Sequence, residues 1–98
     1  RKKMKNKQLC LCIPRISINT TKQFIRTRIE NLELGNIDRI IEIPLKNDSS
    51  YKRVLIKLHY TNEELFCNIK NYFLENQCIK YVYQMPWYWK IFISHQQT

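Results

Sequence analysis

Three short segments of this chain alternate apolar and polar residues with a period of two, and this pattern constrains the fold more than any other feature. The apolar positions are Leu9, Leu11 and Ile13 in the first segment, Val54, Ile56 and Leu58 in the second, and Trp89, Ile91 and Ile93 in the third. Such alternation predicts strands with one buried face and one open face. The isoleucine-rich residues 37–43 predict a fourth strand, and their imperfect alternation indicates a β-bulge.

Two helices are predicted between these strands. Thr20 with Gln23 and Thr61 with Glu64 form capping boxes, which mark helix N-termini. The resulting order is strand, helix, strand, strand, helix, strand. It predicts an α+β, ferredoxin-like (βαββαβ) sandwich, in which a four-stranded antiparallel sheet has both helices on one face. Residues 79–84 are a candidate for an extra short strand that would form a hairpin with the last one.

Length and composition predict one domain. The chain has 98 residues, of which 44% are hydrophobic, enough for a single core. Residues 1–8 hold five of the seventeen basic residues and no acidic one, so they predict a basic arm before a domain at residues 9–98. Such an arm contacts phosphates in many proteins, but it serves equally well as a solubilising end. The formal net charge of +9 therefore belongs partly to the arm.

The residues that alternate with the buried sets are expected to form the open face of the sheet. They are Cys10 and Cys12 in the first strand, Arg53, Leu55 and Lys57 in the third, and Lys90, Phe92 and Ser94 in the last. Together they combine three cations with one aromatic ring and a leucine, without a carboxylate. A surface of this kind suits a phosphate backbone whose bases lie flat on apolar side chains. An ordinary mixed surface with some exposed apolar atoms is the plainer alternative.

The element order and the basic third strand resemble the RNA-recognition motif (RRM) over nearly the whole chain. The family's first signature falls on "LCIPRI" (residues 11–16) and its second on "YKRVLIKL" (residues 51–58). The stacking rings of the family are replaced by Cys12, Arg53 and Leu55, and its glycine is replaced by Lys52. The resemblance implies an RRM-like fold that binds RNA, with an arginine guanidinium able to stack where a ring is missing.

A narrower resemblance is to the small RRM-like proteins of giant DNA viruses. The residues that carry it are "IPR" (13–15), "YKR" (51–53) and "PWYWK" (86–90). It implies a viral origin and a place in the cytoplasm or viral factory of the infected host, with packaging in the virion as a further alternative. Arg15 and Tyr51, which belong to these motifs, join the candidate contact residues.

The segment "PWYWK" contains both tryptophans of the chain, and parity separates their roles. Trp89 alternates with Ile91 and is predicted to lie in the core. Trp87 has the same parity, which favours a position over the end of the core, although the preceding proline places it near a hairpin tip. Tyr88 shares the parity of Lys90 and is the better candidate for stacking.

Catalysis and metal binding are not predicted. The acidic residues are scattered, the only histidines are His59 and His95, and a single glycine cannot form a Gly-rich phosphate loop. The four cysteines are too few for a disulfide scaffold and predict a reducing, intracellular setting, and "CLC" has no second pair at zinc-ligand spacing. No apolar run reaches the roughly 20 residues of a membrane span, and no signal-peptide pattern follows the basic end. We therefore expect no enzyme activity, no cofactor and no membrane association.

The expected function is binding of single-stranded RNA or DNA with weak sequence preference. The candidate contact residues are Cys12, Arg15, Tyr51, Lys52, Arg53, Leu55, Lys57, Tyr88, Lys90 and Phe92. Their cations would neutralise phosphates and their rings would stack on bases. The alternative is a protein-interaction module in a viral complex, because exposed aromatic and basic residues also make protein interfaces.

Overall fold

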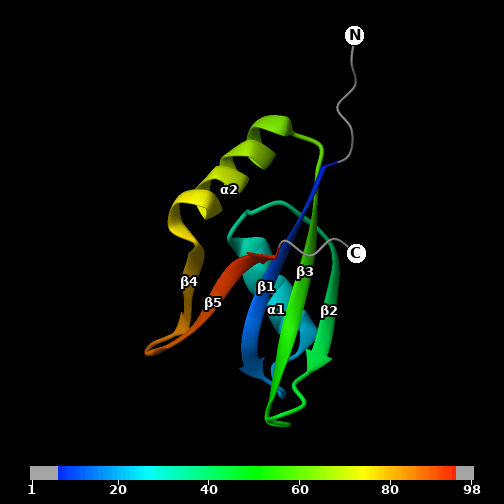
Figure 1. Ribbon diagram of the computed structural model, residues 1–98, viewed down its shortest axis with the longest axis vertical. Coiled ribbons are helices and arrows are strands. Elements are labelled where there is room, and N and C mark those ends of the chain that lie inside the picture. Colours follow the sequence, from blue (N-terminus) through cyan, green and yellow to red (C-terminus); the bar gives the residue numbers. More distant parts are fainter. Residues whose placement is uncertain (1–6, 95–98) are drawn as a thin grey trace.

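The computed structural model describes residues 7–94, which form two helices and five strands (Figure 1). In chain order these are β1 (Lys7–Ser17), α1 (Lys22–Asn31), β2 (Asn36–Pro44), β3 (Tyr51–Tyr60), α2 (Glu63–Asn76), β4 (Cys78–Gln84) and β5 (Trp87–Ser94). The strands form one antiparallel sheet in the order β2-β3-β1-β5-β4. The first strand in the sequence is therefore the central strand of the sheet.

The predicted four-stranded ferredoxin-like sheet is wrong, because the sheet has a fifth strand. β4 forms a hairpin with β5 and pairs with it along nearly its whole length. α2 ends at Asn76, and Gln77 with its positive φ of 67° turns the chain directly into β4. The extra strand considered at residues 79–84 therefore exists, begins one residue earlier, and forms the outer edge of the sheet.

The bulge predicted in the second strand is confirmed in β2, between Ile37 and Arg39. The extra residue reverses the parity of the strand, because two residues of β2 then oppose one of β3. Ile37 packs against the core before the bulge, and Ile40 is buried after it. Ile41 and Ile43 consequently lie on the open face.

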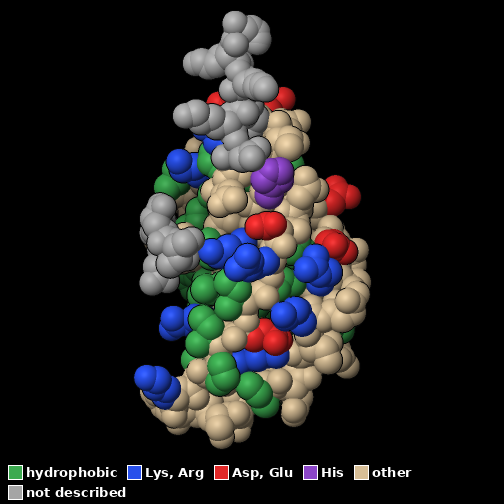
Figure 2. Space-filling view, turned by 90° about the vertical axis from the view of Figure 1, so that its right-hand side faces the viewer, with side chains coloured by type: hydrophobic (Ala, Val, Ile, Leu, Met, Phe, Trp, Pro, Cys, Tyr) green, Lys and Arg blue, Asp and Glu red, His purple; other side chains and the backbone are tan. Residues whose placement is uncertain are grey.

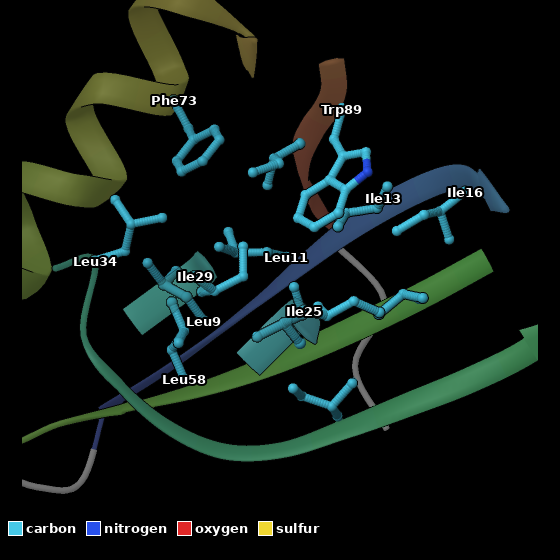
Figure 3. Packing of buried hydrophobic residues seen from close by; sticks show 14 of the residues in the cluster. Leu9, Leu11, Ile13, Ile16, Ile25, Ile29, Leu34, Leu58, Phe73 and Trp89 are labelled. Carbon is cyan, nitrogen blue, oxygen red and sulfur yellow. The ribbon is translucent and has the colours of Figure 1, made fainter. Parts of the chain in front are cut away.

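Both helices pack on the same face of the sheet. Ile25 and Ile29 of α1 and Phe73 of α2 belong to one buried cluster with the inward residues of the strands (Figure 3). The predicted alternating sets supply much of this cluster: Leu9, Leu11, Ile13, Val54, Ile56, Leu58, Trp89 and Ile91 are buried. Removal of this apolar surface from water is the main force that holds the layers together.

Several predicted boundaries shift by one or two residues. The side chain of Thr21 caps α1 by accepting a hydrogen bond from the Phe24 amide, and Asn62 caps α2 in the same way. Each cap lies one residue after the predicted one. β1 begins at Lys7, so the last two residues of the predicted basic arm belong to the sheet, and residues 1–6 lie outside the described part of the chain.

Two polar side chains are buried at opposite ends of β3. Tyr60 is 1% exposed, its hydroxyl donates to the Leu34 carbonyl, and burial raises the pKa of this phenol to about 12. Gly35 lies against the ring, where a Cβ atom would come within 2.7 Å of it. Lys52 is buried at the other end of the strand.

Candidate nucleic-acid interface

A row of apolar side chains crosses the open face of the sheet from one edge to the other. It consists of Ile41 (β2), Leu55 (β3), Cys12 (β1), Phe92 (β5) and Cys78 (β4), which are direct neighbours in the registers of adjacent strands. All of them are partly exposed. Because neighbouring strands lie about 4.8 Å apart, this apolar row is about 19 Å long.

Basic side chains border the apolar row on both sides. Arg39 and Lys57 are neighbours across β2 and β3, two residues along the strands in one direction. In the other direction stand Arg53 on β3 and the facing pair Lys80 and Lys90 on β4 and β5. Two residues along a strand span about 7 Å, so the cations are close to the row. Figure 2 shows lysine and arginine side chains beside hydrophobic ones on one side of the molecule, with acidic side chains among them.

The two thiols on the open face of β1 behave as small apolar groups. Burial raises the pKa of Cys10 and of Cys12, and the nearby cations Lys57 and Arg53 offset part of this rise. Both thiols are therefore protonated at neutral pH. Cys12 accordingly contributes an uncharged, polarisable surface at the centre of the apolar row.

Lys52 does not belong to the open face, which corrects its assignment as a phosphate contact. It is 5% exposed and has the parity of the buried residues of β3. Its ammonium group donates to the Thr20 carbonyl at 2.6 Å and to the Glu42 carboxylate at 2.7 Å. A buried charge needs such partners, and Lys52 stabilises the fold from this position instead of meeting a ligand.

β1 is paired differently along its two edges. Its register with β3 extends over Lys7–Ser17, whereas its register with β5 within the described chain covers only Cys10–Cys12. Beyond this point Pro14 and Arg15 form a bulge in β1, and the β4–β5 hairpin diverges from it (Figure 1). We call the gap between the second half of β1 and the first half of β5 the open seam.

Two adjoining hollows lie in the open seam, each of about 480 Å³. The first hollow, next to the apolar row, is lined by Pro14, Arg15, Pro86, Trp87, Tyr88, Lys90 and Phe92. The second hollow is lined by Arg15, Ile16, Ser17, Tyr51, Tyr83, Gln84, Trp87, Tyr88 and Trp89. Their volumes fall within the range of roughly 300–1,000 Å³ that is typical of small-molecule sites.

Arg15, which lines both hollows, is oriented by two neighbours. Its guanidinium carbon lies 3.9 Å from the centroid of the Tyr51 ring, and its Nη2 atom lies 3.5 Å from the Asp48 carboxylate. The ion pair is largely exposed and contributes little energy, so the stacking on the ring does more to fix the guanidinium plane. The segments "IPR", "YKR" and "PWYWK" thus meet at the open seam, although they are far apart in the sequence.

The two tryptophans have opposite environments. Trp89 is 3% exposed and packs against Phe24, Tyr81 and Tyr83 with ring centroids 5.0 to 6.0 Å apart, which confirms its predicted place in the core. Trp87 is 63% exposed, so the interpretation that it covers the end of the core is wrong. The reason is the divergence of the hairpin, which carries its tip beyond the buried cluster.

The structure brings most of the candidate residues to two neighbouring places. Cys12, Leu55 and Phe92 lie in the apolar row, Arg53, Lys57 and Lys90 border it, and Arg15, Tyr51 and Tyr88 surround the open seam. The sequence pattern does not indicate Arg39 and Ile41, because the β2 bulge reverses their parity, and it does not indicate Cys78 and Lys80 on β4. Pairing residues 79–84 with the last strand around the proline turn would have placed Lys80 beside Lys90.

Residues 7–94 contain no group of three or more His, Cys, Asp or Glu side chains placed to hold a metal ion. No helix in the same range is long and apolar enough to cross a membrane, and His95 lies outside it.

Comparison with known proteins finds no matching family model, no matching curated protein and no matching solved structure. The resemblance to RNA-recognition motifs and to giant-virus proteins stays a prediction.

Proposed function

We propose that this protein binds single-stranded RNA or DNA on the open face of its sheet, without catalysis and with weak sequence preference. The observation that carries this proposal is the apolar row with arginine and lysine side chains on both sides of it. A single strand exposes flat apolar bases along one side and phosphates along the other. The two parts of the face match these two parts of the ligand.

Each part of the face has a separate task. Bases pack on Phe92, Cys12 and Leu55 in the apolar row. Every base offers a π-face for such packing, so sequence preference is weak. Arg53 and Lys90 neutralise phosphates and release their counterions. The guanidinium of Arg53 is also able to stack on a base.

Fluorescence anisotropy of labelled 12-nucleotide RNA and DNA strands, at about 50 and about 200 mM salt, tests the proposal. Arg53→Gln is expected to weaken binding to all sequences alike and to lower the salt slope by about 0.7, the value for one contact to a single strand. Phe92→Ala is expected to remove one stacking contact. Lys22→Gln, at an exposed position of α1, removes the same charge away from the face and should leave affinity nearly unchanged.

The alkylation rates of two cysteines provide a second test of the same proposal. Cys12 lies at the centre of the apolar row, whereas Cys67 is exposed on α2. A bound strand should slow alkylation of Cys12 and leave that of Cys67 unchanged. Unchanged alkylation of Cys12, together with full affinity in both face variants, would refute binding on this face.

A protein-interaction module is the second candidate, and the hairpin tip is the observation that favours it. Met85 is 80% exposed and Trp87 is 63% exposed, an apolar pair of the kind that protein partners bury. Salt separates the two functions. Binding to phosphates weakens steeply between the two salt concentrations, and apolar docking does not.

A further inference from the structure

The first hollow differs chemically from the apolar row that it adjoins at Phe92. The hairpin supplies the rings of Trp87 and Tyr88, which are 63% and 43% exposed, so both are accessible to a ligand. Arg15 and Lys90 add positive charge, and among residues 7–94 no carboxylate lines the hollow. A ligand that is planar, aromatic and anionic matches these walls, and a nucleotide has all three properties.

The charged side chains of the first hollow act only as hydrogen-bond donors, which narrows the choice of base. Tyr51 holds the Arg15 guanidinium at 3.9 Å, and the bond to Asp48 engages only Nη2. Guanine carries two acceptors, O6 and N7, on one edge, and the planar fork of an arginine can donate to both. Adenine has an amino donor in place of O6. This amino group would face the donors of the Arg15 guanidinium without forming a hydrogen bond.

We propose that the first hollow binds one unstacked guanine nucleotide. Its base packs on the rings of Trp87 and Tyr88, its O6 and N7 atoms accept hydrogen bonds from Arg15, and its phosphate lies near Lys90. This inference rests on the proposed function, because a strand that lies on the apolar row reaches the hollow at Phe92. Turning one nucleotide out of a single strand costs less than turning it out of a duplex.

Titration of ¹⁵N-labelled protein with GMP, AMP, CMP and UMP, followed by NMR, tests guanine binding in the first hollow in the absence of an RNA or DNA strand. GMP is expected to shift the indole signal of Trp87 and to bind about tenfold more tightly than AMP, the lower part of the discrimination from one bidentate contact. Equal affinity for GMP and AMP would overturn the proposal. Shifts confined to the apolar row would overturn it as well.

Two variants assign the preference to its residue. Arg15→Lys keeps the charge but removes the fork, so the preference for GMP over AMP should fall by about tenfold, to nearly none. Arg26→Lys makes the same exchange on α1, on the other face of the sheet, and should keep the full preference. An undiminished preference in Arg15→Lys would contradict the assignment.

Strands separate this inference from the proposed function. A 12-nucleotide uridine strand is compared with the same strand carrying one central guanosine. Tighter binding of the second strand supports both proposals. Equal binding of the two strands overturns the guanine site in the first hollow but still supports binding of single strands on the open face. If neither strand binds, the proposed function fails, and the GMP titration alone decides the hollow.

Discussion

The two edges of β1 are built in opposite ways. Along β3 the pairing extends over Lys7–Ser17, and a buried polar side chain closes each end, Tyr60 at one and Lys52 at the other. Along β5 the pairing stops after Cys12. Past this point Trp89 of the hairpin packs against Phe24 of α1 and against Tyr81 and Tyr83 of its own hairpin.

This difference shows how one strand serves both stability and binding. The closed β1–β3 edge fixes the position of the apolar row, because its backbone bonds and buried side chains leave little freedom. The open seam leaves side chains uncovered, and accessible aromatic and basic groups collect there. Binding sites in proteins commonly lie where a rigid scaffold stops and less constrained segments begin.

The largest expected effect concerns the attachment of the hairpin. Trp89→Ala should lower the free energy of unfolding by about 3–5 kcal/mol, because it leaves a cavity among Phe24, Tyr81 and Tyr83. Trp87→Ala, two residues away, should change it by less than about 0.5 kcal/mol, since that ring is exposed. Urea unfolding measures both. Similar losses in the two variants would contradict the opposite environments of the two rings.

The next effect is a pH dependence at one end of the closed edge. Burial raises the pKa of Tyr60 from its ordinary value of 10 to about 12 in the folded state, which favours the protonated phenol. This contribution is complete below pH 10 and is lost as the pH rises toward 12, for a total of roughly 2–3 kcal/mol. Unfolding is measured from pH 8 upward for the wild type and for Tyr60→Phe. The stability of the wild type relative to the variant should decline across this window, and a constant difference would contradict the buried phenol.

The smallest effect concerns the other end of the closed edge. Glu42→Gln removes the charged partner of Lys52 but leaves the Thr20 carbonyl, and the Glu42 side chain is itself 31% exposed. We expect a loss of about 1–2 kcal/mol in the free energy of unfolding. Glu75→Gln, at an exposed position of α2, is the matched control and should change little. Equal stability of the two variants would show that the ion pair between Lys52 and Glu42 does not stabilise this edge.

Local patterns in the sequence predicted the buried half of the molecule well. Alternation placed Leu11, Ile56 and Ile91 in the core, because burial of one sheet face leaves a period of two in the sequence. The number of strands was wrong, because β4 carries mixed polar and apolar residues at the edge of the sheet. Residues 79–84 were a candidate for this strand, and their pairing with β5, a tertiary property, decides it.

The candidate site was predictable in part for the same reason. Parity placed Arg53, Leu55 and Phe92 on the open face correctly. The parity rule alone predicts that Lys52 lies under the helices. Because a lysine is rarely buried, its charge favoured the wrong assignment to the open face. The open seam had no sequence signal, because it depends on where two strands diverge.

The outer edges of the sheet also differ, and this difference limits how the sheet could be extended. β2 has a bulge next to Ile37 and ends at Pro44, which has no amide hydrogen to donate, so its outer edge is irregular. β4 pairs regularly from Cys78 to Val82 with its inner neighbour and leaves its other side unpaired within the described chain. An additional strand would therefore join at β4. Two copies joined there in antiparallel fashion, with residue 80 opposite residue 80, would bring their Lys80 ammonium groups close together, and this repulsion between like charges opposes edge-to-edge aggregation.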